Sequence, residues 1–451
     1  MRVRRTRRRA DPFRLSLALL IVVSVSKFGA YFGILRLIRP ALILFAFCVG
    51  YALLHPKKIL LANLKGSVTV RLLVAIGVVA VCSAAFGISL GHAATVIINN
   101  FFKTLAITFL IIVTLRDIGD LRRLTWAFAF GGILLAFLSI FVVGISKVSG
   151  AATYDANDVG VFMVMTLPFT LLFVQSAATK RERLVAIIGI GLLAATIVKT
   201  QSRGAFIGAL VVCAALLLMP GVTVGRRLVF IGAATLTMVV AAPAGYWMSM
   251  QHILADPKAD YNWDAINGRR NLARRGMGYM KMYPVFGIGI DNFPKAEGTI
   301  SEKALNLVPG HGIRWTSPHN SFVQAGAETG VVGFLVWVSL LIANMIIPLR
   351  IARRMPRAWR NGTPDQRFLS FAALYLPIAQ VGFAVTAFFV SFAWMEPLYF
   401  LSALVAGLAL IAARELRPIT AAIGGEGWRS RRSGASPEFA SQPPAGLNPI
   451  A

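Results

Sequence analysis

Charged residues are scarce in this sequence, and acidic residues are the scarcest of them. Only 14% of the 451 residues are charged and 57% are hydrophobic, while 18 Asp and Glu stand against 46 Lys and Arg. A soluble domain carries roughly a quarter charged residues, so this composition excludes an ordinary soluble fold. The sequence instead repeats apolar runs of about 20 residues, which is the length that crosses a bilayer.

Other features that signal cofactors or processing are also missing. The three cysteines, Cys48, Cys82 and Cys213, lie inside apolar runs and have no disulfide or metal-ligand spacing. Asp256 and Asp260 are one helical turn apart, but no His joins them. There is no phosphate-binding Gly-Lys-Ser/Thr loop and no dinucleotide fingerprint. We therefore expect no metal and no nucleotide or other cofactor.

The apolar runs predict an all-α integral membrane protein of about 12 transmembrane helices, with one large periplasmic loop that contains short helices. The expected spans are 13–30, 36–54, 71–90, 94–115, 122–144, 157–177, 183–199, 203–220, 227–248, 321–349, 367–391 and 395–413.

Lys and Arg collect in alternate loops between these runs, which is the pattern of cytoplasmic loops. This placement explains the net charge of +28 without nucleic acid, so no nucleic-acid partner is expected. It predicts cytoplasmic termini and five segments, in chain order. They are a basic N-terminus (1–12) with no cleavage site after it, helices one to nine (13–248), a periplasmic loop (249–320), helices ten to twelve (321–413) and a disordered tail (414–451).

Two basic residues lie on the side where this charge rule expects few. Lys199 and Arg203 flank a very short outer turn, and Ser202 can cap the helix that Arg203 begins. Arg203 can reach past the lipid headgroups to water, or it can form an anion site together with the helix N-terminus. The spacing alone leaves both interpretations open.

The outer loop adds a basic helix between Gly268 and Tyr283. Arg270, Arg274 and Lys281 share a face that is expected to be solvated, with Arg275 also on the solvated side. Arg269 lies at the start of the apolar face and should point at the protein, so it is the functional candidate of this helix.

Ser317-Pro318-His319-Asn320 precedes the tenth span. Ser317 is a suitable N-cap and Pro318 a suitable first helical residue, so His319 is expected to open the helix at the outer surface. Asn320, Gln324 and Glu328 follow at spacings of four and form a polar stripe that should face a cavity or a partner helix. His319, close to an arginine cluster and this stripe, is a candidate general base.

Two further features have both a structural and a functional interpretation. Lys103 lies within the fourth span and either contacts an anion or extends to the headgroups. Asp155 and Asp158 precede the sixth span, where capping of that helix is favoured over ligand binding.

These residues occur in an order that resembles a known family. The motifs are Ser202-Arg203-Gly204, Asn267-Gly268-Arg269, Tyr283-Pro284-Val285-Phe286-Gly287-Ile288-Gly289 with Asn292-Phe293, His319-Asn320-Ser321-Phe322-Val323-Gln324, and Glu328-Thr329-Gly330 with Gly333. Together they resemble the bacterial O-antigen ligase and O-antigen polymerase superfamily, over roughly residues 155–345. The sequence departs from the family pattern at Ala273, where Trp is common.

The resemblance implies a metal-independent, inverting glycosyltransferase of the bacterial inner membrane. Its donor would be a glycan on a polyprenyl diphosphate, and its acceptor a hydroxyl on a glycan, lipid A core or protein. Carried over by position, Arg203 and Arg269 would bind the diphosphate and His319 would act at the acceptor hydroxyl. Further substrate contacts are expected from Arg270, Arg274, Asn320, Gln324, Glu328, Lys199 and Lys103.

Two alternatives remain open from the sequence. Twelve spans also suit a transporter of a small anion such as bicarbonate, although the polar residues gather at one membrane face and not at the midplane where carriers bind. The sequence also does not exclude a protein O-oligosaccharyltransferase.

Overall fold

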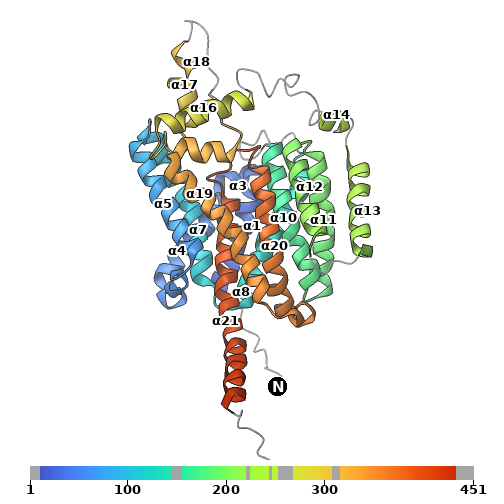
Figure 1. The fold of residues 1–451 in the computed structure, drawn as a ribbon. Helices are drawn as coiled ribbons and strands as arrows, with labels where there is room; N and C mark the ends of the chain where they lie inside the picture. Colours follow the sequence, from blue (N-terminus) through green and yellow to red (C-terminus); the bar gives the residue numbers. More distant parts are fainter. Residues whose placement is uncertain are drawn as a thin grey trace, which may run out of the picture.

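The computed structural model describes residues 11–144, 155–219, 224–242, 246–251, 268–306 and 315–432. In this part of the chain every regular element is a helix, as predicted (Figure 1). Eight of these helical segments are long and apolar enough to cross a membrane. They are Gly33–Leu54, Val68–Phe86, Leu90–Thr114, Ile118–Val142, Ala156–Ser176, Ser321–Arg354, Pro364–Thr386 and Glu396–Arg417.

The other four expected spans are also helical. Two of them are the shorter apolar helices α1 (Pro12–Ser26) and α12 (Arg203–Leu217). The remaining two coincide with α11 (Lys180–Lys199) and α13 (Val224–Ala241). The described residues thus contain a helix at each expected place, and the count of twelve crossings remains a prediction.

Several of the long helical segments are built from more than one element. The elements of the first half are α2 (Phe28–Tyr31), α3 (Gly33–Ile38), α4 (Pro40–Leu54), η1 (Pro56–Lys58), η2 (Leu61–Leu64), α5 (Val68–Phe86), α6 (Leu90–Val96), η3 (Ile97–Phe101), α7 (Phe102–Thr114), α8 (Ile118–Phe137), η4 (Leu138–Val142) and α10 (Ala156–Ser176). The two elements η3 and η4 are π-helical turns.

The second half contains the outer-loop helices and the last three long helices. Its elements after α13 are α14 (Tyr246–Gln251), α16 (Arg269–Met282), α17 (Phe293–Thr299), α18 (Glu302–Leu305), α19 (Ser321–Arg354), η7 (Arg357–Asn361), α20 (Pro364–Thr386) and α21 (Glu396–Arg432). The segment expected as a loop therefore contains short helices, and α16 to α18 lie together at one end of the bundle (Figure 1).

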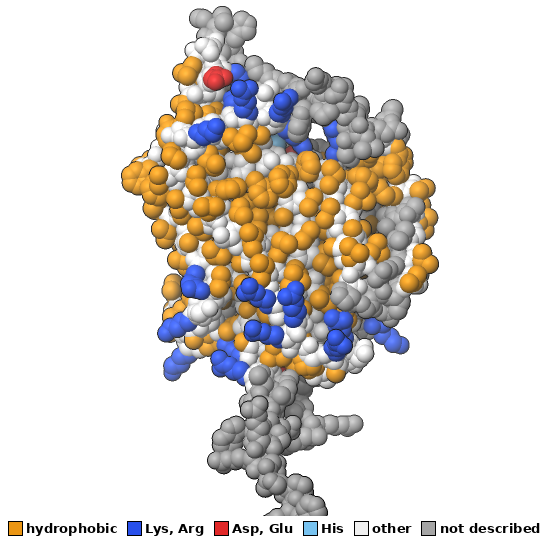
Figure 2. Space-filling model, viewed as in Figure 1, with side chains coloured by type: hydrophobic (Ala, Val, Ile, Leu, Met, Phe, Trp, Pro, Cys, Tyr) orange, Lys and Arg blue, Asp and Glu red, His pale blue; other side chains and the backbone are white. Residues whose placement is uncertain are grey.

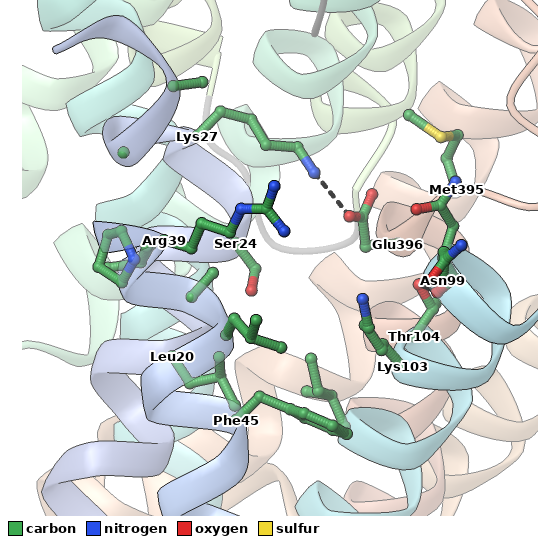
Figure 3. Close-up of a pocket in the computed structure, with 18 of the residues that line it drawn as sticks. Leu20, Ser24, Lys27, Arg39, Phe45, Asn99, Lys103, Thr104, Met395 and Glu396 are labelled. Atoms are coloured by element: carbon green, nitrogen blue, oxygen red, sulfur yellow. Dashed lines mark hydrogen bonds and ion pairs between the residues drawn. The ribbon is translucent and has the colours of Figure 1, made fainter. Parts of the chain in front are cut away.

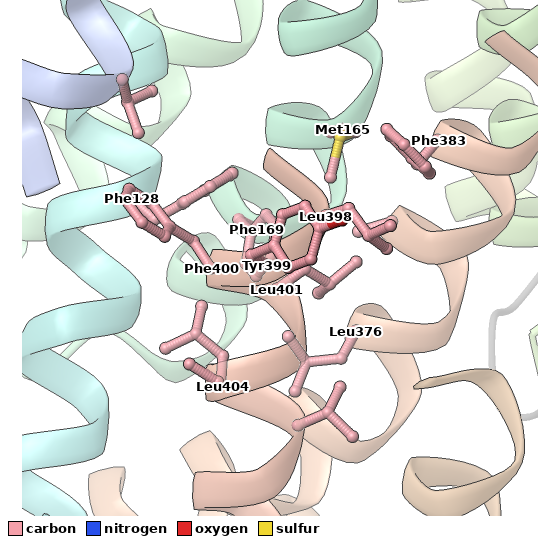
Figure 4. Packing of buried hydrophobic residues seen from close by; sticks show 14 of the residues in the cluster. Phe128, Met165, Phe169, Leu376, Phe383, Leu398, Tyr399, Phe400, Leu401 and Leu404 are labelled. Atoms are coloured by element: carbon pink, nitrogen blue, oxygen red, sulfur yellow. The ribbon is translucent and has the colours of Figure 1, made fainter. Parts of the chain in front are cut away.

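The centre of the bundle is formed by α10, α20 and α21. In the apolar stretch of each of these helices, 83%, 72% and 78% of the residues are buried. Aromatic and aliphatic side chains such as Phe128, Phe169, Phe383 and Tyr399 interdigitate there (Figure 4). By contrast, only 6% of the residues in the apolar stretch of Gly33–Leu54 are buried, so this segment lies at the periphery with most of its surface available to lipid.

Basic side chains gather at the end of the bundle opposite α16, below a broad band of hydrophobic side chains (Figure 2). Ion pairs fix this end: Arg14 with Asp120 at 2.7 Å, and Arg122 with Glu182 at 2.7 Å. These pairs join the first turns of α1, α8 and α11. The loops that were predicted to lie on one side of the membrane therefore do share one end of the molecule.

The structure differs from the expected boundaries at three places. The helix α20 ends at Thr386 and not at 391, whereas α21 begins at Glu396, one residue from the expected start. The segment expected to be a disordered tail is helical as far as Arg432, and residues 433–451 lie outside the described residues. The expected span 227–248 is interrupted after α13, which ends at Ala241.

Candidate functional site

The connector between α20 and α21, residues 387–395, is the element on which the predicted site residues meet. It is tied to the start of α19 by hydrogen bonds of Ser321, whose N–H donates to Ala387 O at 2.7 Å and whose hydroxyl donates to Val390 O at 2.8 Å. The Ser321 oxygen also accepts from Phe392 N–H at 2.9 Å. Because Ser321 is fully buried, these bonds fix the connector against the N-terminus of α19.

His319 lies against this connector, but it does not open α19 as the sequence predicted. The helix α19 begins at Ser321, and its N-cap is Asn320, whose side chain accepts from Phe322 N–H and Val323 N–H. His319 thus precedes the helix, with a left-handed φ of 48°. The N-cap is Asn320 and not the predicted Ser317, because the Asn320 carboxamide oxygen reaches the free N–H groups of the first turn. The His319 N–H donates to Ser391 Oγ at 2.9 Å, which attaches it to the connector.

Arg203 is the first residue of α12, as predicted, and the preceding Ser202 caps that helix. The Ser202 hydroxyl accepts from Ala205 N–H at 3.2 Å and donates to Asn157 Oδ1 at 2.7 Å. This second bond joins the N-terminus of α12 to that of α10. The first turn of α10 is stabilised by a capping box between Asp155 and Asp158, so the capping interpretation of these carboxylates is confirmed.

The N-terminus of α12 also packs against the connector. A Cβ atom added to Gly204 would come within 2.6 Å of the Cβ atom of Phe389, so only glycine allows this approach. Arg269, the first residue of α16, places its guanidinium carbon 5.6 Å from the centre of the Phe389 ring, a cation–π contact. Gly204, Arg269 and His319 therefore contact Phe389 or Ser391 on one short segment, although they lie far apart in the sequence. Arg203 precedes Gly204 in the first turn of α12.

The motif between Tyr283 and Asn292 is hydrogen-bonded to α19 around a kink in that helix. Gly330 has a φ of 68° inside this helix, and the helix is kinked there. The N–H groups of Ile288 and Gly289 donate to Ala327 O and Glu328 O, both at 3.0 Å, and Val331 N–H donates to Pro284 O at 2.7 Å. Added Cβ atoms at Gly287 and Gly330 would collide with the facing backbone, so this motif needs its glycines for close packing.

The predicted polar stripe of α19 is hydrogen-bonded within the protein, and two of its three residues are buried. Asn320 is the N-cap, Gln324 accepts from Ala393 N–H at 3.1 Å, and Glu328 accepts from Asp291 N–H at 2.9 Å and from Trp394 Nε1 at 2.5 Å. Gln324 and Glu328 are 5% and 1% exposed. In this structure the stripe positions the connector and the outer-loop motif.

The solvated face predicted for α16 is partly confirmed. Arg270, Arg274 and Lys281 are exposed, whereas Leu272 and Tyr279 are buried. The prediction for Arg275 is wrong, because this residue is not on the solvated side. Its Nε and Nη2 atoms donate to both carboxylate oxygens of Glu297 at 2.6–3.0 Å, and the Glu297 side chain is fully buried.

The Tyr279 hydroxyl also donates to Glu297, at 2.8 Å. Burial, and then the neighbouring carboxylate, raise the pKa of Tyr279 above its ordinary value, so Tyr279 stays a hydrogen-bond donor. Arg275, Tyr279 and Glu297 thus join α16 to α17. Helical periodicity could not reveal this, since the partner carboxylate follows 22 residues later.

Arg275→Ala is expected to loosen the outer loop, because it leaves the Glu297 carboxylate buried without its partner. Loss of one partner of a buried ion pair costs about 3–5 kcal/mol. We expect limited proteolysis between Gly268 and Asn306 to become much faster in this variant. Lys281→Ala, on the exposed side of the same helix, is the control. Equal cleavage rates in the Arg275 and Lys281 variants would show that the pair does not stabilise the loop.

The two predicted lysines lie in different surroundings. Lys199 is exposed at the end of α11, close in sequence to Arg203. Lys103 lies in the first turn of α7 and lines a cavity together with Trp394 and Glu396. It therefore faces the connector region from a different helix than the arginines do.

No group of three or more His, Cys, Asp or Glu within the described ranges could hold a metal ion. Asp291, a candidate ligand, pairs with His92 at 3.2 Å. Burial raises the pKa of Asp291, and the His92 ring partly offsets this. Asp256, Asp260 and His311 lie outside the described residues.

Phe389, Ser391 and Trp394 are residues that the sequence analysis missed. Phe388 to Glu396 contains neither Gly nor Pro, so the apolar pattern predicts helix to residue 391.

The fold defines an all-helical protein with the features of a multi-pass membrane protein, and comparison with known families agrees. A family described as O-Antigen ligase matches residues 188–338, about a third of the chain. This match contains Arg203, Arg269 and His319, and it confirms the resemblance to the O-antigen ligase and polymerase superfamily. No curated protein matches the chain.

Proposed function

We propose that this protein transfers a glycan from a polyprenyl diphosphate carrier to an acceptor hydroxyl, by a metal-independent displacement that inverts the anomeric centre. The family match supports a glycosyltransferase of the O-antigen ligase or polymerase type. The observation that carries the finer proposal is the meeting of Arg203, Arg269 and His319 on the connector 387–395.

In the proposed reaction, His319 accepts the proton of the acceptor hydroxyl as its oxygen attacks the anomeric carbon. The bond between that carbon and the diphosphate oxygen breaks, and polyprenyl diphosphate leaves. Arg203 and Arg269 stabilise the charge that develops on the leaving group, because guanidinium groups pair with phosphate oxygens in a bidentate way. Arg270, Arg274 and Lys199, exposed near these arginines in sequence, are proposed to contact the glycan or diphosphate.

The proposal includes an orientation in the bacterial inner membrane. Both termini would be cytoplasmic, and α16 to α18 would lie in the periplasm. The support is the sharing of one bundle end by the basic loops, which are typical of the cytoplasmic side. The donor and acceptor would then reach the site from the outer leaflet and the periplasm.

Transport of bicarbonate or another small anion, and O-glycosylation of protein, are not favoured by the family match. The contacts of Arg203, Arg269 and His319 lie near helix termini, whereas carriers bind their substrates near the middle of the membrane.

Transfer with purified protein tests the proposed function. Given a polyprenyl diphosphate carrying an α-linked glycan and an acceptor glycan, the protein should release polyprenyl diphosphate and form a β-linked product. Nuclear magnetic resonance of the product reads the anomeric configuration. A retained configuration would contradict the single displacement, and uptake of bicarbonate into proteoliposomes without any transfer would favour a carrier.

A further inference from the structure

A second cationic feature lies on the other side of the connector from the predicted arginines. It is a cavity of about 520 Å³ enclosed by α1, α3, α4, η3, α7 and the start of α21 (Figure 3). Four basic residues line it, namely Lys27, Arg36, Arg39 and Lys103, and we call it the basic pocket. Neither Arg203, Arg269 nor His319 lines this pocket, so its ligand would be distinct from theirs.

The charge in the basic pocket is largely uncompensated. Glu396 is the one acidic residue among its lining residues, and it pairs with Lys27 at 2.6 Å (Figure 3). No carboxylate of the described residues forms an ion pair with Arg36, Arg39 or Lys103. The second oxygen of Glu396, Oε2, is buried and accepts no hydrogen bond. Arg36 and Arg39 are exposed and Lys103 is half-buried, so their charges are available to an anionic ligand, and a hydroxyl or other donor on that ligand would satisfy Glu396 Oε2.

The backbone around the pocket is also unusual. Lys27 and Arg39, which end α1 and begin α4, have φ values of 50° and 52°. Non-glycine residues rarely adopt left-handed conformations, because Cβ then approaches the following carbonyl oxygen. On the opposite wall, the π-helical turn η3 puts Asn99 and Asn100 into the lining. Such turns occur often at binding sites, and here two strained residues and a π-turn all border the same cavity.

The remaining lining is apolar and continuous with the lipid-facing surface. Leu20, Leu42, Phe45 and Ile107 lie beside the charged groups. Leu42 is 41% exposed, and Leu37, in the short helix α3 above it, is 83% exposed. A ligand with a charged head and a long apolar chain can therefore enter laterally between α3–α4 and α7 without leaving the membrane.

We propose that the basic pocket binds the phosphate-bearing headgroup of an amphiphile, with its chains along α4. Phosphate oxygens would pair with Arg36, Arg39 and Lys103, and a hydroxyl of the headgroup would donate to Glu396 Oε2. This amphiphile is a second lipid and not the polyprenyl diphosphate donor, an assignment that rests on the proposed function. It is either a phosphorylated glycolipid acceptor or an anionic phospholipid of the membrane.

The pocket is joined to the candidate site by Trp394. This residue lines the pocket, and its Nε1 atom donates to Glu328, which in turn holds the outer-loop motif at Asp291 N–H. A headgroup in the pocket would thus lie next to the connector to which His319 is hydrogen-bonded. For a glycolipid, this places the sugar end where an acceptor hydroxyl is needed.

Binding to the purified full chain in detergent tests this inference without measuring transfer. The probes are a bisphosphorylated glycolipid, phosphatidylglycerol, a polyprenyl diphosphate and, without phosphate, diacylglycerol. The test variant combines Arg39→Asn with Lys103→Gln, since Asn tolerates the left-handed φ and neither side chain has an ion pair to lose. Lys57→Gln, an exposed lysine in η1 outside the pocket, is the matched control.

We expect the double variant to bind the phosphorylated glycolipid or phosphatidylglycerol at least tenfold more weakly by native mass spectrometry, with diacylglycerol and polyprenyl diphosphate unaffected. Preference for the glycolipid would identify an acceptor site, and equal binding of both would identify a membrane-lipid site. An equal loss of lipid binding in Lys57→Gln, or equal binding of diacylglycerol, would contradict the proposal that the basic pocket binds a phosphate headgroup. Loss of polyprenyl diphosphate binding in the double variant would overturn the assignment to a second lipid.

Discussion

Arg269→Ala and Arg203→Ala should each reduce the transfer rate by about 10²- to 10³-fold, which is the usual effect of removing one group that stabilises a leaving oxyanion. Arg269 contacts the connector at Phe389 through its guanidinium, and Arg203 directly precedes Gly204, which packs against the same Phe389. Arg→Lys at either position should restore little, because a lysine lacks the planar fork that pairs with two phosphate oxygens. Transfer is measured with purified protein at saturating acceptor.

Lys281→Ala is the control for this series, since it removes a cation from the exposed side of α16. All variants must reach the membrane at wild-type levels, because Arg269 also contacts Phe389 and could affect packing. If Arg269→Ala keeps more than half of the wild-type rate, the diphosphate is not bound by this arginine. A similar loss in Lys281→Ala would indicate a general charge effect in place of a specific contact.

His319→Asn is expected to lower transfer by about 10²- to 10⁴-fold, the usual contribution of a general base. Asn is the informative substitution because His319 has a left-handed φ, which Asn adopts more readily than Ala. The backbone N–H that donates to Ser391 Oγ is kept in this variant. Loss of activity would therefore report on the imidazole and not on the connector.

The matched control for this histidine is His311→Ala, which removes the Gly-flanked histidine of the outer loop and should be much milder. The pH profile adds a second readout, since an enzyme that needs a neutral imidazole loses rate at low pH. In His319→Asn this limb should disappear from the residual activity. Near-wild-type transfer by His319→Asn would remove the general-base role.

The sequence was sufficient for the helical class and for the local placement of Arg203 and Arg269. Arg203 and Arg269 do begin helices α12 and α16, and the polar stripe of α19 is on one face. These features depend on local patterns such as caps and the period of a helix. They could be predicted because each is encoded within a few neighbouring residues.

The partners of these residues could not be predicted in the same way. Glu297 neutralises Arg275 from another helix, and Trp394 meets Glu328 from 66 residues away. Such pairs depend on how the helices pack, about which a single periodic pattern says nothing. The connector 387–395 was missed because an apolar segment without Gly or Pro looks the same whether it continues a helix or ends it.

The basic pocket, too, could not be predicted from the sequence. Lys103 was noticed as a cation within a span, but Lys27, Arg36 and Arg39 are spread over the first two apolar runs. Only the breaks at Lys27 and Arg39, each with a left-handed φ, turn these residues toward one cavity. Non-glycine residues rarely adopt this conformation, so nothing in the local sequence predicts it.

Transfer in excess EDTA is the most direct test of the claim that arginines, and not a metal ion, neutralise the diphosphate. Arg203 and Arg269 hold their charge at any physiological pH, so the reaction they support needs no added cation. The purified protein, given a polyprenyl diphosphate glycan and an acceptor, should turn over at the same rate with and without EDTA. Activity that is lost on chelation and restored by Mg²⁺ or Mn²⁺ would contradict the account.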